Sequence, residues 1–215
     1  MAEQHDPHII PRGRHAPPLE VRLSVQRRRL FHAAATVFAR VGYAEASAEA
    51  ISREAGMSKA TFYEHFANKE ECILALFDEA ATEVMRAMAN AVADDTSSYE
   101  ARIRANVVSF LEVLTQYPES AQTLLVEIIG AGPRAAERRD AILDAFAEGL
   151  MRDNGRMAER IGAPRFASKD DAFAIIGAIV ELVSRQLRTG VPEDVRKLEP
   201  VIERLIFGLL RSGAR

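Results

Sequence analysis

The sequence has few of the features that mark disulfide-stabilised, secreted or membrane proteins. It contains one cysteine, Cys72, so no disulfide can form within the chain, and a reducing compartment is expected. We interpret Cys72 as an ordinary residue on a helix face, with a redox switch as the alternative. No apolar run approaches the roughly 18 residues that a membrane span needs. The N-terminus lacks the pattern of a secretory signal, so we predict a cytoplasmic protein without membrane contact.

Patterns typical of enzymes and metalloproteins are missing as well. The sequence contains no HExxH, GxSxG, P-loop or dinucleotide-type glycine pattern. Four of the five histidines fall at or before residue 32, and the metal-ligating residue types form no cluster along the chain. We therefore predict no catalytic residue, no metal site and no cofactor, and a protein that is not an enzyme.

Charge is unevenly divided along the chain despite a net charge of −3. Residues 1–70 carry 10 Lys and Arg against 8 Asp and Glu, whereas residues 71–215 carry 18 against 23. The most basic stretch is residues 12–30, with six Arg and one Glu. A basic head on an acidic body fits a small nucleic-acid-binding domain joined to a domain with another task.

Hydrophobic periodicity is helical almost throughout, and no strand pattern is convincing. Apolar residues recur at helical spacing between Leu30 and Val41, and Gly42 supplies a C-terminal stop. The sequence predicts an all-α fold of about nine helices, near residues 30–41, 47–55, 58–66, 68–88, 97–116, 118–130, 133–162, 169–189 and 200–210. The expected organisation is a flexible arm over 1–18, a helix-turn-helix domain over 19–68 and a larger helical domain over 69–215.

Residues 47–66 contain the motif that points to a function. Two helices of about two turns each flank a turn at Gly56, where glycine accepts a positive φ without steric cost. Ser58 is placed to cap the second helix. A helix of this width fits the major groove of DNA, where each base pair presents its own pattern of donors and acceptors.

The segment AISREAGMSKATFYEHFANKEE resembles the signature of the tetracycline-repressor (TetR) family. The resemblance is specific over roughly residues 26–74 and rests beyond that on length and helix pattern. Three positions depart from the usual family residues, at Ala48, Ser52 and Ala60. The resemblance implies a homodimer that binds a double-stranded DNA operator and responds to a small-molecule effector.

The resemblance also implies a division of labour within the motif. Base edges would be read by Lys59, Ala60 and Thr61, from a helix that Ser58 caps and orients. Base contacts of this kind carry the sequence information of an interface. The change from the common glycine at Ala60 affects which bases are read.

Phosphate contacts are assigned by the same resemblance to residues around the motif. Ser47 would use its hydroxyl and backbone amide, Tyr63 its phenol with His65 beside it, and Lys69 its ammonium. Such contacts position a protein on DNA without reading its sequence. In the arm, Arg12 and Arg14 flank a glycine, a pattern typical of peptides in narrow minor grooves. A disordered tail with non-specific phosphate attraction is the alternative for the arm.

The larger domain would hold a ligand pocket and a dimer interface, as the resemblance implies. Glu127 is the polar pocket candidate, for a cationic ligand or a ligand hydroxyl, with a solvent-facing side chain as the alternative. The apolar pocket candidates, for which plain core is the alternative, are Phe110, Leu114, Leu125, Phe146, Met151 and Phe173. The helix at 169–189 is apolar on more than one side and is predicted to pair with the last helix in a two-fold four-helix bundle, with burial inside one chain as the alternative.

The function that these patterns favour is a ligand-responsive DNA-binding transcriptional regulator. We expect a repressor that binds a palindromic operator as a homodimer and that a small hydrophobic effector releases. An activator of the same fold and a ligand-independent DNA-architectural protein are the alternatives. The long acidic C-terminal part argues against the architectural protein.

Overall fold

The structure is a computed structural model and describes residues 18–91 and 98–213. These residues form nine α-helices and two short 3-10 helices and contain no strand, so the all-α prediction is confirmed. The elements in chain order are α1 (Leu19–Glu45), α2 (Ala48–Glu54), α3 (Lys59–His65), α4 (Lys69–Ala91), α5 (Tyr99–Gln116), α6 (Pro118–Leu125), η1 (Glu127–Gly130), α7 (Pro133–Ile161), α8 (Lys169–Thr189), η2 (Val195–Leu198) and α9 (Glu199–Gly213).

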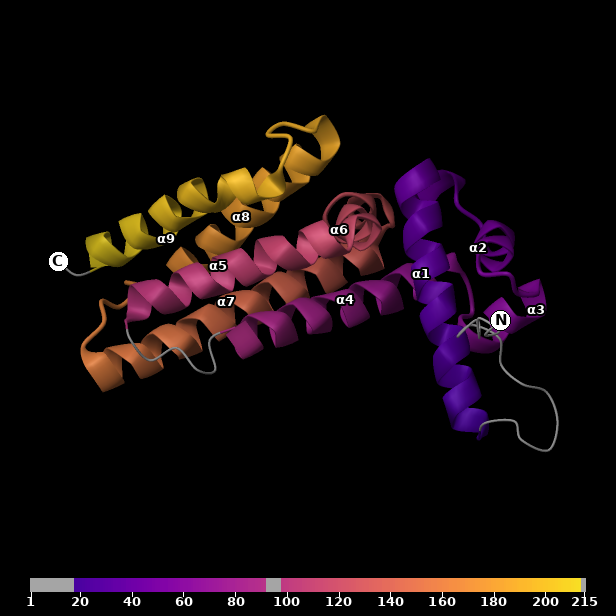
Figure 1. Cartoon of the computed structure of the whole chain (residues 1–215), viewed down its shortest axis with the longest axis horizontal. Coiled ribbons are helices and arrows are strands. Elements are labelled where there is room, and N and C mark those ends of the chain that lie inside the picture. The colour runs from indigo at the N-terminus through magenta and orange to yellow at the C-terminus, as the bar shows by residue number, and fades with distance from the viewer. Residues whose placement is uncertain (1–17, 92–97, 214–215) are drawn as a thin grey trace, which may run out of the picture.

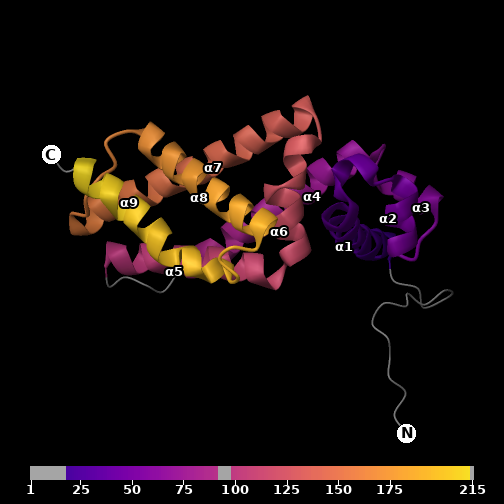
Figure 2. The same cartoon turned by 90° about the horizontal axis from the view of Figure 1, so that it is seen from above.

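The molecule is elongated, with a small three-helix unit at one end (Figure 1). Helices α1, α2 and α3 form this unit, and α4 runs from it into a bundle built from the remaining long helices (Figures 1 and 2). Within the bundle α4 packs against α5, and α7 packs against α8. Helix α6 packs across α1, and η1 and α4 contact α1 as well, so three elements of the larger part meet the small unit.

The core of the small unit is built by one face of α1. Leu30, Val37 and Phe38 are fully buried there, as the helical spacing of these apolar residues predicts. Ile51 of α2 and Phe62 of α3 are fully buried against the same core. Helix α1 begins at Leu19, well before the first residue of this face, so its basic N-terminal part lies outside the core.

The core of the small unit continues into the larger part of the chain. Ile73 of α4, Leu124 of α6, Ile128 of η1 and Ile142 of α7 belong to the same buried cluster. The division of the chain at residue 69 stays a prediction, and packing is continuous across that point. A displacement of α6 or η1 therefore reaches α1 through side chains already in contact.

Cys72 lies in this shared core and is fully buried. Burial raises the pKa of its thiol to about 12. The thiolate is the reactive form of cysteine. A thiol held in the protonated form and shielded from solvent favours the packing interpretation of Cys72 over the redox switch.

Two neighbouring aromatic residues on α3 test this description of the small core. Phe62 is fully buried, whereas Tyr63 is 50% exposed. We expect Phe62→Ala to lower the free energy of unfolding by about 3–5 kcal/mol, because it leaves a cavity in the core. The matched control Tyr63→Ala should cost less than about 1 kcal/mol. Chemical denaturation followed by circular dichroism measures both, and equal losses would contradict the assigned inner face.

Candidate nucleic-acid interface and ligand cavity

Both motif helices begin at a serine whose side chain caps the helix. The Ser47 hydroxyl accepts a hydrogen bond from the Ala50 amide at 3.1 Å, at the start of α2. The Ser58 hydroxyl accepts one from the Thr61 amide at 3.1 Å, which confirms the predicted cap of α3. Each cap satisfies one backbone donor that the first turn of a helix leaves unpaired.

The turn between α2 and α3 depends on Gly56. Its φ of +63° lies in the left-handed region, and a Cβ there would lie 3.4 Å from the Arg29 guanidinium. That guanidinium donates to the Ala55 carbonyl at 2.8 Å, so a residue of α1 satisfies the C-terminal end of α2. The angle between the two motif helices is thereby tied to α1.

The outer face of α3 is open to solvent in the way a recognition helix requires. Lys59, Ala60, Tyr63 and Glu64 are exposed, whereas the inner face carries buried Phe62. Thr61 is half-buried, and its hydroxyl lies 2.9 Å from the Ser58 hydroxyl. Lys59, Ala60 and Tyr63 are therefore presented together, with Thr61 at the margin of this surface.

Lys69, for which the family resemblance implied a phosphate contact, lies against the end of α1. Its ammonium donates to the carbonyls of Tyr43, Ala44 and Ala46 at 2.8, 2.9 and 3.0 Å. It also lies 4.6 Å from the centroid of the Tyr43 ring, a cation–π contact. These bonds use all three ammonium protons, so a phosphate contact by Lys69 requires one of them to be exchanged.

His65, which the resemblance placed beside a phosphate contact, packs toward α1 instead of facing solvent freely. It is half-buried, with its Nε2 3.4 Å from the side-chain oxygen of Gln26 on α1. Burial lowers the pKa of His65, and the nearby Arg27 lowers it further. The imidazole is therefore uncharged at neutral pH and links α3 to α1. The remaining predicted contacts, Arg12 and Arg14, lie outside the described residues.

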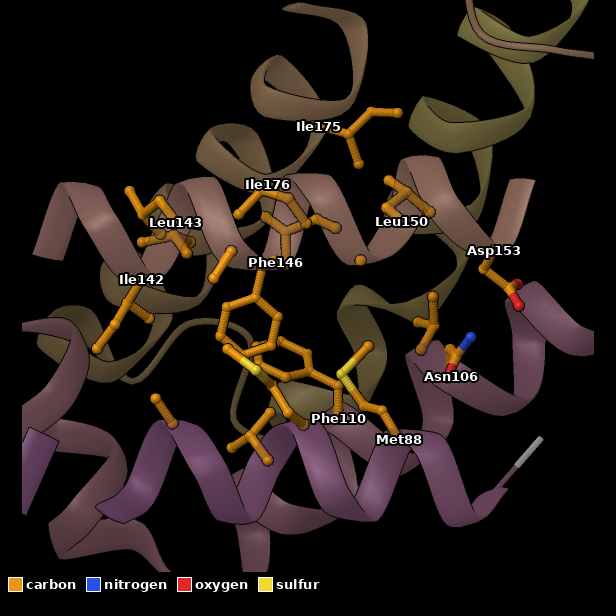
Figure 3. A pocket seen from close by; sticks show the side chains of 18 of the residues that line it. Met88, Asn106, Phe110, Ile142, Leu143, Phe146, Leu150, Asp153, Ile175 and Ile176 are labelled. Carbon is orange, nitrogen blue, oxygen red and sulfur yellow. The ribbon is translucent and has the colours of Figure 1, made fainter. Parts of the chain in front are cut away.

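A cavity of about 590 Å³ lies within the bundle and is lined mainly by apolar side chains of α4, α5, α7 and α8. Figure 3 shows Phe110 of α5 and Phe146 of α7 directed toward each other across it, with Met88 of α4 beside them. Four predicted pocket residues line the cavity, namely Phe110, Leu114, Leu125 and Phe146. The sequence-based prediction missed Met85 and Met88, although Met88 stands in the apolar stripe of α4 that continues beyond the small unit.

One end of the cavity is polar. Arg102 of α5 and Asp153 of α7 form an ion pair at 2.6 Å, and their side chains are only 15% and 21% exposed. Asn106 lies beside Asp153 at this end, far from Ile142 at the other (Figure 3). Arg152 and Arg156 of α7 also line the cavity, and Arg152 pairs with Glu148 at 3.5 Å. The lining at this end therefore holds three arginines and one carboxylate, that of Asp153.

Three predicted pocket residues do not line this cavity. Phe173 is 42% exposed on the outer side of α8. Met151 packs against the second buried cluster, which α5, α8 and α9 dominate. Glu127 is directed away, and its carboxylate accepts hydrogen bonds from the Tyr43 amide at 3.1 Å and the Gln122 side chain at 3.3 Å. Helical periodicity identifies a buried face but cannot tell which neighbour a side chain meets.

The described residues, 18–91 and 98–213, contain neither a membrane-spanning helix nor a metal-ligating cluster. No helix in these ranges is long and apolar enough to cross a membrane. Within the same residues, no group of three or more His, Cys, Asp and Glu side chains is arranged to hold a metal ion.

The lowered pKa of His65 gives a pH-dependent prediction. Because the unfolded chain binds the proton more readily, the contribution of His65 to stability is present above about pH 6.5, the ordinary histidine value. It should be lost as the pH falls below that value. We expect His65→Gln to flatten the decrease in the free energy of unfolding between pH 7 and pH 5. The control His32→Gln changes an exposed residue of α1, and an equal effect of both variants would contradict the assignment.

Comparisons with known proteins agree with this geometry. The family described as bacterial regulatory proteins of the tetR family matches residues 30–76. The HTH-type transcriptional regulator YdgC of Bacillus subtilis is 24% identical over 192 residues, covering 87% of this chain and 94% of YdgC. The HTH-type transcriptional activator FasR of Mycolicibacterium smegmatis is 27% identical over 139 residues, covering 63% of each chain.

Solved structures share the fold over nearly the whole chain. FadR of Bacillus subtilis, determined in complex with stearoyl-CoA, has a TM-score of 0.74 at 18% identity and covers 87% of this chain and 99% of its own. The fatty acid degradation regulator FadR of Bacillus halodurans has a TM-score of 0.72 at 21% identity, covering 86% and 96%. Residues 30–76 therefore match the tetR family of bacterial regulatory proteins, and the chain as a whole shares the fold of these two solved structures.

Proposed function

We propose that this protein is a repressor that binds a palindromic operator as a homodimer and that a small hydrophobic effector releases. The observation that carries the proposal is the presence in one chain of an exposed α3 face and an apolar cavity. A shared core joins the two. A ligand that fits two conformations unequally shifts their populations and hence the DNA affinity.

In the proposed complex α3 lies in the major groove. Lys59, Ala60 and Thr61 face base edges, while Ser47 and Tyr63 contact the phosphates on either side. Exposure of Lys59, Ala60 and Tyr63 on α3 supports this orientation. Two copies would place their α3 helices about 34–36 Å apart, one turn of DNA.

The dimer is proposed to form through α8 and α9. These helices lie side by side at the outer edge of the bundle (Figures 1 and 2). Helix α8 buries Ile175, Ile179 and Val183 inside the chain, yet Phe173 on another face is 42% exposed. An exposed large aromatic residue on α8 suits a self-complementary interface, in which the same surface of each copy is used.

The proposed effector is a long apolar chain with an anionic head, such as an acyl-CoA. The α7 residues that line the cavity extend from Arg139 to Arg156, roughly 25 Å of helix. The excess of arginine at the end near Asp153 suits an anionic head, and the apolar remainder suits the chain. The stearoyl-CoA bound by FadR of Bacillus subtilis is a molecule of this kind. The activator FasR supports the alternative in which binding raises transcription.

The decisive experiment is selection of binding sites from random double-stranded DNA, repeated with stearoyl-CoA. We expect an inverted-repeat site, whose occupancy falls when stearoyl-CoA is added. Recovery of no preferred sequence would contradict the operator proposal and favour the architectural alternative. Size-exclusion chromatography with light scattering on the same sample tests the dimer.

Variants of Lys59 and Lys69 distinguish the reading of bases by α3 from the structural support of the motif. Because Lys59 is exposed on α3, we expect Lys59→Ala to cost about 1–3 kcal/mol of binding and to relax base preference, with stability unchanged. We propose that Lys69 exchanges one of its three carbonyls for a phosphate in the complex. Lys69→Ala should then weaken binding to all sequences and lower the salt slope by about one, and it should also lower stability, since three carbonyls lose a donor. DNA-binding titrations at several salt concentrations, together with thermal melting, distinguish the two variants. Unchanged binding by both variants would show that α3 is not the recognition helix.

Two glycines of α7 test the cavity. Gly149 lines it, whereas Gly155 does not, and a Cβ at Gly155 would meet open space. We expect Gly149→Leu to reduce stearoyl-CoA affinity at least tenfold by occupying the cavity, a loss of about 1.4 kcal/mol. DNA affinity without ligand should remain. Gly155→Leu should leave the stearoyl-CoA affinity and the operator affinity unchanged. Isothermal titration calorimetry measures the first affinity, and an operator titration measures the second. Equal ligand affinity in the two variants would place the ligand elsewhere.

A further inference from the structure

The last turn of α1 is broken in a way that leaves a backbone donor to be satisfied from elsewhere. Gly42 has φ 77° and ψ 162°, outside helical values, so the chain changes direction before Tyr43. The Tyr43 amide then donates to the Glu127 carboxylate at 3.1 Å, across 84 residues of sequence. A Cβ at Gly42 would lie 3.4 Å from the same carboxylate oxygen, so the two segments are in close contact.

The segment after the break, residues 42–46, is held on its other side by α4. Lys69, the first residue of α4, donates to three of its carbonyls. The next residue, Ser47, caps α2. The position at which α2 begins is therefore determined by a carboxylate from η1 and an ammonium from α4.

Glu127 is also directly connected to the cavity. Leu124 and Leu125, in the last turn of α6, line the cavity, and Glu127 follows two residues later. The Leu125 carbonyl accepts a hydrogen bond from Ser184 of α8 at 2.9 Å. On the other carboxylate oxygen, Gln122 of α6 donates at 3.3 Å. A shift of the last turn of α6 therefore moves Glu127 relative to the segment that it holds.

We propose that Glu127 is a positioning residue that transmits occupancy of the cavity to α2 through the Tyr43 amide. The inference rests on the proposed function, in which an apolar effector regulates DNA binding. Hydrogen bonds weaken steeply as they lengthen and bend, so a displacement of about 1 Å in the last turn of α6 is enough to release the Tyr43 amide. Once the hydrogen bond to Glu127 is lost, only the Lys69 ammonium still binds this segment. The segment before Ser47 then no longer keeps α2 in the orientation that binds the operator.

The test compares Glu127→Ala with Glu119→Ala. Glu119 is exposed in the first turn of α6, so its variant makes the same change of charge nearby. The probes are stearoyl-CoA and an operator duplex recovered by selection. In the native protein and in Glu119→Ala, we expect stearoyl-CoA to raise the operator dissociation constant at least about fivefold, the lower end of measured couplings. In Glu127→Ala, stearoyl-CoA should raise the operator dissociation constant by less than about twofold. By reciprocity, the effect of the operator on the affinity for stearoyl-CoA should fall by the same factor.

A conservative variant distinguishes a residue that transmits ligand binding to the DNA-binding helices from one that only stabilises the fold. Glu127→Gln keeps an oxygen that accepts from the Tyr43 amide, and Gln122 can turn its amide to match. We expect Glu127→Gln to show the same stearoyl-CoA-induced increase in the operator dissociation constant as the native protein. A residue with a merely structural role would change stability without changing this factor, which thermal melting of the same variants reveals. A folded Glu127→Ala protein with the native factor would overturn the inference.

Hydrogen exchange of the native protein supplies a test that needs no variant. We expect stearoyl-CoA to speed exchange of the amides in residues 42–47, because the Tyr43 amide loses its acceptor. Unchanged exchange there, in a protein whose operator affinity does respond, would overturn the inference and leave the proposed function intact. A native protein whose operator affinity does not respond to stearoyl-CoA overturns the proposed effector and the inference with it.

Discussion

The backbone of residues 42–46 has polar groups that its own helix cannot satisfy, and the architecture of the molecule depends on how they are satisfied. A buried or partly buried backbone group without a partner is costly. Here one amide bonds to a carboxylate of η1 and three carbonyls bond to one ammonium of α4. These two partners are polar contacts between the larger part of the chain and the segment that leads into the motif helices.

Packing at this junction supports the same connection. Alanines at positions 33–35 of α1 are buried, and α1 packs against α6. The Thr123 hydroxyl of α6, fully buried, donates to the Ala35 carbonyl at 3.4 Å. Ile128 of η1 is fully buried in the same cluster as Phe38. The core of the small unit is therefore completed by residues close in sequence to Leu124 and Leu125, which line the cavity.

The cavity follows from an uneven distribution of side-chain size in the bundle. Long apolar side chains on α5 and α7 converge, while Ala81, Ala89 and Gly149 leave space on α4 and α7. The half-buried pair Arg102–Asp153 places charge at one end of an otherwise apolar space. Leaving such a pair buried has a desolvation cost. A ligand that is apolar along most of its length and charged at one end matches both features.

Sequence alone determined the helices, the motif and the class of the protein, because these depend on local spacing. Leu30, Phe38, Ile51 and Phe62 are buried as their periodicity predicts, and Ser58 caps α3 as its position predicts. Four of the pocket residues were predictable because large apolar side chains on long helices face the interior. The family signature added the functional class, since its spacing is specific.

Only the tertiary structure decided the partners of the polar residues. Lys69 and Glu127 both stand at the start of a helix, and nothing in their neighbours indicates that both meet the segment after Gly42. His65 is adjacent in sequence to exposed Glu64, yet its neighbours in space are Gln26 and Arg27. The physical reason is range: helix periodicity extends over a few residues, whereas these contacts join positions 23 to 84 residues apart.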